Sequence, residues 1–412
     1  MADSETLEAA PPSPRWSAWR TVVGFGVVSL AADMVYEGAR SITGPFLASL
    51  GATALVVGLV TGAGEAAALV LRLASGPFAD RSGRYWSLTI LGYAMTAVCV
   101  PLMAVAPFVG GAGVVVASTM VILERTGKAI RSPSKSALLA SAAKAVGRGR
   151  GFAVHKALDQ VGAFAGPLLV AGLVALTSAM WTGLAVLAIP GLVSLLLLVW
   201  IRARVPDPGV YDPDARAHAA PSHQGAAGGL PTRFYLFALS SAASTLGLMT
   251  FGIISFHLVD SGLLAAPVVP ILYAAAMAAE AVAALLTGFT YDRRGAKVLL
   301  SLPFLVATVP LLTLADQLWV AVAGVLIWGG AVGVHDSTVK ALVADLVPAP
   351  RLATAYGVFA AFQGGAALAG GGLAGWLYAG GRGDLVVVIA ICQVLSLVLL
   401  VVVLRTRPLR SA

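Results

Sequence analysis

The sequence carries little charge and few of the residues that hold metals. Asp, Glu, Lys and Arg together make up 11% of the 412 residues, whereas soluble domains contain about 25%. The two cysteines and five histidines show no spacing typical of a disulfide framework or a metal centre. No P-loop, His-Glu-x-x-His or nucleophile-elbow pattern occurs. We therefore expect that the protein is not an enzyme and that it has no metal and no cofactor.

Long apolar runs take the place of charge. Hydrophobic residues make up 58% of the chain, and a helix of roughly 20 such residues crosses ~30 Å of hydrocarbon. The run "LAVLAIPGLVSLLLLVWI", residues 184–201, is apolar on every side, which excludes the alternating strands of a β-barrel. The sequence predicts an all-α integral membrane protein. Its twelve predicted transmembrane helices cover residues 18–49, 53–78, 87–107, 112–140, 151–177, 181–202, 233–259, 267–290, 298–315, 317–345, 353–379 and 385–404.

Basic residues are distributed unevenly between the predicted loops. If the N-terminus is cytoplasmic, Arg382 is the only Lys or Arg in the outside loops, and the inside segments collect most of the others. We therefore expect cytoplasmic N- and C-termini in a multi-pass protein of the plasma or inner membrane. Trp16 and Trp19 are suited to the membrane interface before the first helix. The net charge of +8 then reflects topology, and no nucleic-acid binding is expected.

The two halves of the chain repeat one another. The segment "GPFADRSGRYW", residues 76–86, reappears as "GFTYDRRGAKV", residues 288–298, in the corresponding loop of the second half. Parallel repeats of this kind predict two six-helix bundles, and the Pro- and Gly-rich stretch between them predicts a flexible linker. The predicted organisation is an N-terminal tail 1–17, a bundle 18–202, a linker 203–232, a second bundle 233–404 and a tail 405–412.

The repeated loops resemble the signature of the major facilitator superfamily. That family has a Gly, then Asp-Arg, then Gly with another basic residue between its second and third helices, and a copy between helices eight and nine. The resemblance implies two six-helix repeats, alternating access and a monomer. It also implies that these turns latch the bundles together in the outward-facing state. The matching residues are Gly76, Asp80, Arg81, Gly83 and Arg84 in the first copy, and Gly288, Asp292, Arg293, Gly295 and Lys297 in the second.

Ionisable residues inside the predicted spans are candidate functional groups, because each costs roughly 2.5 to 3.5 kcal/mol to insert. Asp33, Glu37 and Arg40 share one face of the first helix. The family resemblance implies that helices one, four, seven and ten line the cavity, so we expect Asp33 and Glu37 to face Arg125 and Lys128 of the fourth helix. The proton-coupling candidates are Asp33 first, Glu37 second, and Asp159 of the fifth helix. A purely structural role in ion pairs is the alternative for each of them.

The candidate substrate cavity has two different walls. The N-terminal wall carries charge, and the C-terminal wall is more apolar and aromatic, which suits an amphiphilic organic molecule. Packing or lipid contact is the alternative for the aromatic residues. The candidate cavity residues are Arg40, Glu124, Arg125, Lys128, His335, Asp336, Phe359 and Gln363.

Small residues in the fifth helix predict close helix packing. Gly162 and Gly166 are four residues apart and are followed by Pro167. This run is similar to the antiporter signature of the superfamily, but the glycine pair expected after the proline is reduced to Gly172.

The sequence thus predicts a secondary transporter that exports a small organic solute by proton antiport. One alternative is a proton-coupled importer or exporter of an anionic solute, bound by Arg125, Lys128 and Arg131. A membrane receptor that does not transport is a further alternative. The expected partners are a small-molecule substrate, protons and the lipid bilayer.

Overall fold

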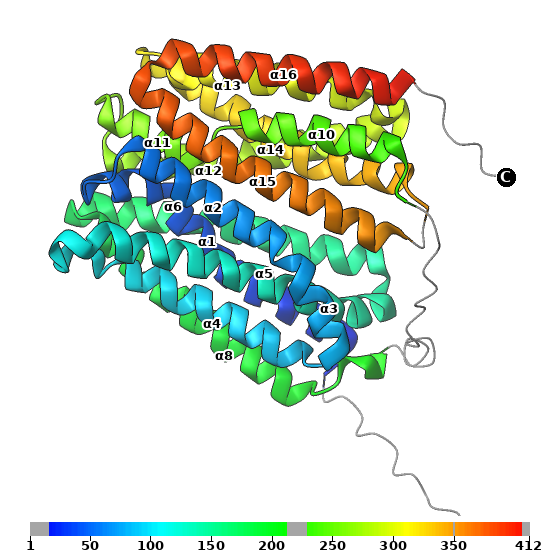
Figure 1. Ribbon diagram of the computed structural model, residues 1–412. Coiled ribbons are helices and arrows are strands. Elements are labelled where there is room, and N and C mark those ends of the chain that lie inside the picture. Colours follow the sequence, from blue (N-terminus) through cyan, green and yellow to red (C-terminus); the bar gives the residue numbers. More distant parts are fainter. Residues whose placement is uncertain (1–15, 212–228, 349–350, 406–412) are drawn as a thin grey trace, which may run out of the picture.

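The computed structural model describes residues 16–211, 229–348 and 351–405, and every regular element in these ranges is a helix (Figure 1). Most of the predicted tails and of the predicted linker 203–232 lies outside the described residues. The N-terminal half contains α1 (Ala18–Ser49), α2 (Ala54–Val70), α3 (Arg72–Ser82), α4 (Tyr85–Met103), α5 (Gly113–Val146), α6 (Arg148–Thr177), α7 (Met180–Ala185) and α8 (Ala188–Arg204). The C-terminal half contains α10 (Thr232–Gly247), α11 (Phe251–Asp260), α12 (Val269–Arg294), α13 (Ser301–Thr313), α14 (Leu318–Leu346), α15 (Leu352–Gly380) and α16 (Arg382–Arg405).

Short signals in the sequence set several helix ends. The Ser17 hydroxyl accepts a hydrogen bond from the Arg20 amide at 3.3 Å and caps the start of α1. Thr53 caps α2 in the same way through the Val56 amide, at 3.4 Å. Gly83 ends α3 with φ +63°, a left-handed conformation that a residue with a Cβ adopts only at a cost.

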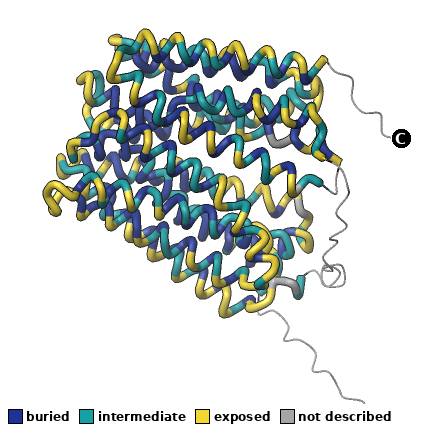
Figure 2. The backbone as a smooth tube through the Cα atoms, in the orientation of Figure 1, coloured by how far each residue is buried: buried dark blue, intermediate teal, exposed yellow. Residues whose placement is uncertain are grey.

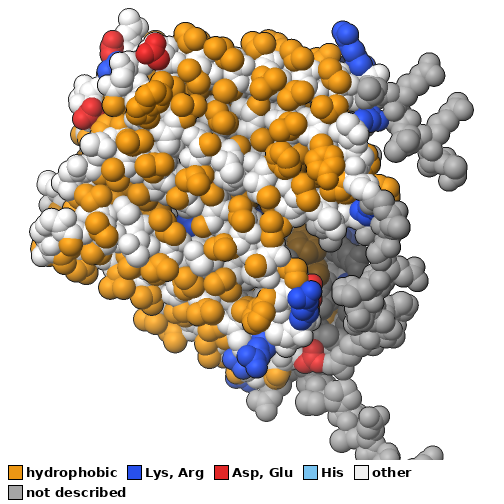
Figure 3. All heavy atoms as spheres, viewed as in Figure 1, with side chains coloured by type: hydrophobic (Ala, Val, Ile, Leu, Met, Phe, Trp, Pro, Cys, Tyr) orange, Lys and Arg blue, Asp and Glu red, His pale blue; other side chains and the backbone are white. Residues whose placement is uncertain are grey.

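The described residues include ten stretches that are long and apolar enough to cross a membrane. One of them, Ala266–Thr313, contains both α12 and α13. The helix α5 is not among the ten; it carries Glu124, Arg125, Lys128 and Arg131 along its length. Large apolar side chains are exposed on the outer surface, which Figure 3 shows as a broad hydrophobic face. The all-helical membrane class predicted from the apolar runs is confirmed.

The helical bundle as a whole has two ends, which we call the terminal end and the far end. At the terminal end α1 begins and α16 ends, on the right in Figure 1; at the far end α1 ends and α2 begins. Figure 2 shows the buried residues on the sides of the helices that face one another. Figure 3 shows a hollow near the terminal end, between the start of α15 and α3.

The hydrophobic cores differ between the two ends. At the far end both halves share one core, which joins Phe46 and Val57 of the first half to Ile253 and Trp328 of the second. At the terminal end each half has a core of its own, around Phe25 in the N-terminal half and around Phe237 in the C-terminal half. The halves are therefore packed together at the far end.

Glycines allow this close contact between the halves. A Cβ atom at Gly58 of α2 would overlap the backbone carbonyl of Gly371 in α15, and one at Gly371 would overlap that of Gly58. The Thr61 and Thr250 hydroxyls meet across the same interface at 2.8 Å. Small residues let two helices approach until their backbones touch, which is a common form of packing in membranes.

Candidate functional site

The helices α1 and α6 lie in direct backbone contact, and this contact brings two carboxyl groups together. A Cβ at Gly162 would overlap the Leu30 carbonyl, and one at Gly166 would overlap the Met34 carbonyl. The predicted packing glycines thus lie against α1, and Pro167 continues α6 beside them. Short side chains can meet only where backbones are this close.

The carboxyl groups of Asp33 in α1 and Asp159 in α6 lie close enough to each other to share a hydrogen bond. A carboxylate only accepts hydrogen bonds, so a bond between two carboxyl groups requires a proton on one of them. Lys156 reaches Asp159 at 3.3 Å, and the Lys156 side chain is 66% exposed. The pair is therefore a candidate site for one proton, and Lys156 places a cation beside it.

The Ser29 hydroxyl, close to this acidic pair, contacts three polar side chains. The Ser29 hydroxyl is one turn before Asp33 on α1 and contacts His155 Nε2 at 3.0 Å and Tyr93 at 3.3 Å. Lys135 of α5 donates to the same hydroxyl at 3.0 Å. These contacts connect α1 and α6, one turn before the acidic pair, to α4 and α5 through polar groups.

The second group of charges, which we call the arginine network, consists of Glu37, Arg40, Glu65, Glu124 and Arg125. Glu65 of α2 bridges two arginines, Arg40 at 3.0 Å and Arg125 at 3.4 Å. Arg125 also lies 3.6 Å from Glu124 and donates to the Tyr36 hydroxyl. The pattern of charges in α1 and α5 led us to expect Arg125 to face Asp33 and Glu37, but the ion pairs that it makes in the described part of the chain are with Glu65 and Glu124.

Aromatic rings cover two further cations of α5. The Lys128 Nζ atom lies 3.4 Å from the centre of the Tyr36 ring, and the Arg131 guanidinium lies 4.7 Å from that of Tyr93. Arg131 also donates to the Thr96 hydroxyl. Cation–π contacts of this kind are worth about 2 kcal/mol when they are desolvated, so these cations are held within the N-terminal half.

One hydrogen bond of the arginine network crosses between the halves. The Tyr273 hydroxyl of α12 donates to Glu37 Oε2 at 2.5 Å. Tyr273 is fully buried, and Glu37 also lies 3.8 Å from Arg40. Glu37 therefore links the two halves directly.

The seventh predicted span is interrupted beside the C-terminal part of the site. α10 ends at Gly247 and α11 begins at Phe251, and the Met249 carbonyl between them accepts a hydrogen bond from Trp328 Nε1 at 2.8 Å. Thr250, which precedes α11, makes the contact with Thr61 described above. Broken helices expose backbone groups in the middle of a membrane and are common at transport sites.

Three of the predicted cavity residues belong to one cluster in the C-terminal half. The Gln363 amide donates to Ser241 at 2.5 Å and contacts His335 Nε2 at 3.2 Å, and its oxygen accepts from Thr245. His335 Nδ1 lies 3.3 Å from Asp336, whose side chain is 60% exposed. Phe359, the fourth predicted residue, stacks on Phe237 with ring centres 5.9 Å apart.

The two repeated loops both lie at the terminal end and are exposed. Asp80 accepts a hydrogen bond from Tyr85 at 3.0 Å, within its own loop, and Arg81 and Arg84 are exposed beside it. Gly76 lies inside α3, against Pro133 of α5. In the second loop, Asp292 and Arg293 are exposed, Gly295 has φ +64°, and Arg293 lines a surface pocket of about 650 Å³ with Arg294 and Lys297.

Several residues of the site were not singled out by the sequence. Tyr273 lies two helical turns before Glu280, an ionisable residue of the same helix, so a shared helical face could have indicated it. Tyr36 is adjacent to Glu37, and Ser29 is one turn before Asp33. The roles of Tyr36 and Ser29 depend on contacts with other helices, and a single sequence carries no signal for such contacts.

Comparison with known proteins gives a consistent result for the whole chain. A family model described as the Major Facilitator Superfamily matches residues 25–279 and 237–412. Uncharacterised proteins of Mycobacterium tuberculosis and Mycobacterium bovis are 54% identical over 388 residues, which cover 94% of this chain and 93% of theirs.

Solved structures of transporters share the fold. The nucleoside transporter NupG superposes with a TM-score of 0.69 at 14% identity, covering 93% of this chain and 99% of its own. A bacterial homologue of the lysosomal transporter Spinster, in an inward-facing and occupied conformation, gives 0.67 at 14% identity, with 96% of each chain covered. A peptide transporter of the POT family in complex with sulfate gives 0.69 at 15% identity, with 98% of each covered.

Proposed function

The chain belongs to the major facilitator superfamily of membrane transporters, and on that premise we propose that it exports a small organic solute in exchange for protons. The observation that carries the proposal is the close approach of the carboxyl groups of Asp33 and Asp159 between α1 and α6. A pair that shares one proton within the membrane can release it when its surroundings change, as a coupled transporter requires.

The proposed topology has twelve transmembrane helices. It adds the charged helix α5 to the ten apolar stretches and counts α12 and α13 separately. The excess of Lys and Arg places the terminal end, with both chain termini, in the cytoplasm. The far end then faces the outside of the cell. The bundles 18–202 and 233–404 are packed together there, so the described conformation is closed to the outside. A monomer in the plasma or inner membrane fits this arrangement.

The charges of the site favour a neutral or cationic substrate over an anion. Arg125 is engaged by Glu65 and Glu124, so its charge is already balanced within the protein. In the C-terminal half, the Asp336 side chain is 60% exposed within the apolar helix α14. Because Arg125 is occupied, an anion gains little from it, which favours a neutral or cationic substrate.

The repeated loops are proposed to act on the conformational switch. Asp80 and Arg81, with Asp292 and Arg293, are exposed at the terminal end while the far end is closed. When the terminal end closes, each Asp can meet the positive end of a neighbouring helix. These turns then stabilise the outward-facing state, as the family resemblance implies.

The test is proton flux in everted membrane vesicles. A pH-sensitive dye reports dissipation of an imposed pH gradient while cationic, neutral and anionic compounds are added. We expect cationic or neutral compounds to dissipate the gradient with the wild type, and we expect the response to be lost with Asp33→Asn and Asp159→Asn. The matched control is Asp316→Asn, which removes an exposed carboxylate paired with Arg382 at the far end and should leave the flux unchanged.

The outcomes separate the elements of the proposal. If both site variants respond like the wild type at equal membrane levels, the acidic pair does not carry the proton. If only anionic compounds elicit a response, the anionic-solute alternative is correct. If substrate crosses the membrane without any proton movement, the protein is not proton-coupled.

A further inference from the structure

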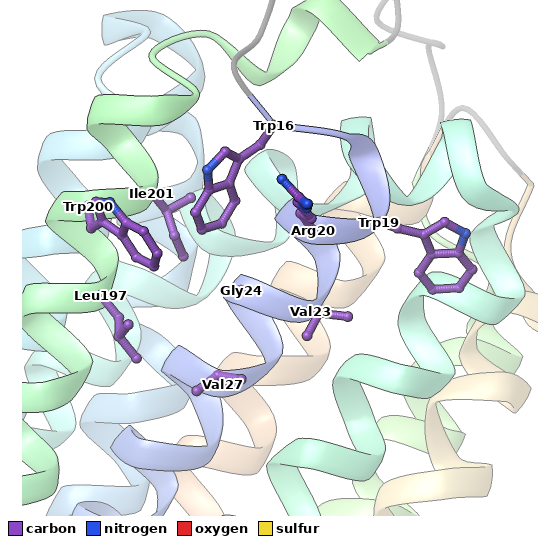
Figure 4. Close-up of a pocket in the computed structure, with 9 residues that line it drawn as sticks. All are labelled: Trp16, Trp19, Arg20, Val23, Gly24, Val27, Leu197, Trp200 and Ile201. Atoms are coloured by element: carbon purple, nitrogen blue, oxygen red, sulfur yellow. The ribbon is translucent and has the colours of Figure 1, made fainter.

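A groove on the outer surface, lined by the first turns of α1 and the last turns of α8, has no role in the transport site. Its volume is about 710 Å³. Figure 4 shows Trp16 and Trp200 on one side of Arg20 and Trp19 on the other, with small apolar side chains further along α1. The lining residues are Trp16, Trp19, Arg20, Val23, Gly24, Val27, Leu197, Trp200 and Ile201.

The groove has an apolar floor, and Arg20 is the one charged residue among those that line it. The Trp16 and Trp200 rings meet edge to face with centres 4.9 Å apart and form one wall. A Cβ at Gly24 would lie 3.1 Å from both Trp16 and Ile201, so this glycine brings the two helices close at the floor. Among the residues that the structure describes, no carboxylate pairs with the exposed Arg20 side chain.

The position of the groove along the membrane matches the headgroup region. Arg20 lies in the first turn of α1 and Trp200 near the end of α8, both at the terminal end of membrane-spanning helices. Tryptophans concentrate where lipid headgroups meet the acyl chains. The last turn of α8 adds Arg202 and Arg204 at the same level, so the mouth of the groove carries positive charge.

We propose that this groove binds one anionic phospholipid from the leaflet on the terminal side. The phosphate pairs with the Arg20 guanidinium, which matches phosphate oxygens geometrically. One acyl chain lies along Val23, Val27 and Leu197. The proposal depends on the membrane location of α1 and α8 and is independent of proton coupling.

The first test is native mass spectrometry of the purified full chain with phosphatidylglycerol and phosphatidylcholine of identical acyl chains. The wild type should bind phosphatidylglycerol about fivefold more tightly, the ratio that corresponds to roughly 1 kcal/mol per basic residue at an anionic surface. Arg20→Gln should abolish this preference and Arg20→Lys should keep most of it. Val27→Trp, which fills the groove, should weaken binding of both lipids.

The matched control is Arg405→Gln, which removes an exposed arginine from the last turn of α16 at the same end of the molecule. It should leave the preference intact. Equal affinity of the wild type for both lipids, or an unchanged preference in Arg20→Gln, would overturn the proposal. So would a loss of preference in Arg405→Gln as large as that in Arg20→Gln.

A second experiment identifies the occupant in membranes. A photo-crosslinking amino acid in place of Val23, which is 42% exposed, should yield a phosphatidylglycerol adduct. An adduct with a peptide from residues 1–15, or with a second copy of the chain, would show that protein occupies the groove and would refute lipid binding there.

Discussion

Replacing Tyr273 by Phe should open the far end of the transporter. The Tyr273 hydroxyl donates to Glu37 Oε2 at 2.5 Å and joins the two halves. The substitution removes this hydroxyl and leaves the ring contacts with Phe251 and Trp328 in place. The bond exists only when the halves are together at this level, so its loss destabilises the far-end-closed state relative to the open one.

The magnitude follows from the chemistry of this bond. Hydrogen bonds between membrane helices average about 0.6 kcal/mol with a maximum near 1.7 kcal/mol, and bonds to charged groups lie toward the upper end of their range. A loss of about 1 kcal/mol multiplies the ratio of open to closed molecules by about five. This is large enough to measure and too small to unfold the protein.

The assay measures how fast a thiol reagent, added on the side of the membrane at the far end, labels a single cysteine. The cysteine is placed where the far-end-closed state buries it. Ser255→Cys provides it, because Ser255 is fully buried and lies against Gly44 of the other half. The two native cysteines, Cys99 and Cys392, are first replaced by Ala. Tyr273→Phe should then accelerate labelling about fivefold.

The control is a second tyrosine whose bond stays within one half. Tyr378 of α15 bonds His257 of α11 at 2.9 Å, and both lie in the C-terminal half near the far end. Tyr378→Phe should leave the labelling rate unchanged. If Tyr273→Phe also leaves it unchanged, or if both variants accelerate it equally, the bond to Glu37 does not hold the halves together.

The same interface can be locked. Cysteines at Thr61 and Thr250, whose hydroxyls are 2.8 Å apart across the halves, should cross-link and stop transport until a reductant is added. Cysteines at Thr177 and Thr182, 2.6 Å apart within the N-terminal half, should cross-link without stopping it. Transport by the locked Thr61/Thr250 protein would show that the far end need not open.

Two further predictions concern stability, measured by thermal unfolding in detergent. Gly166→Leu places a side chain against the backbone of α1 and should destabilise the protein by about 2 kcal/mol or more. Gly172→Leu is the control and should be neutral, because nothing lies within 4 Å of its Cβ position. Equal effects of the two substitutions would contradict the proposed packing. Glu65→Gln leaves Arg40 and Arg125 partly unpaired and should lower the free energy of unfolding by about 1 to 3 kcal/mol. The control Asp316→Asn breaks an exposed pair and should lower it by less than about 0.5 kcal/mol. An unchanged stability of Glu65→Gln would show that the bridge contributes little.

The helices could be predicted closely because the signal is local. Apolar runs predicted helices at 18–49 and 385–404, and the structure has α1 at Ala18–Ser49 and α16 at Arg382–Arg405. The break between α10 and α11 was not predicted, because residues 248–250 are as apolar as their neighbours. Trp328 stabilises that break from another helix, so its cause is not local.

The partners of the charged residues could be predicted only in part. Helical periodicity placed Asp33, Glu37 and Arg40 on one face, but it does not show which neighbour each of them meets. Arg125 pairs with Glu65 because α2 packs against α5 at this level, where Gly64 faces the Arg125 side chain. The rotation and the neighbours of each helix depend on packing of the whole bundle, which a single sequence does not specify.

The helix α1 connects the acidic pair, the arginine network and the contact between the halves. Asp33 contacts α6, Glu37 contacts α12 of the other half, and Arg40 contacts α2, all from one face of one helix. Neighbours at four-residue spacing lie about 6 Å apart, so a change of charge at Asp33 acts directly on Glu37 and on its bond to Tyr273. The proposal makes that bond in the far-end-closed state and breaks it in the open state, which supplies the two-state element that energetic coupling requires. In the proposed mechanism, proton binding and far-end opening are therefore coupled over one turn of α1, without a longer pathway through the protein.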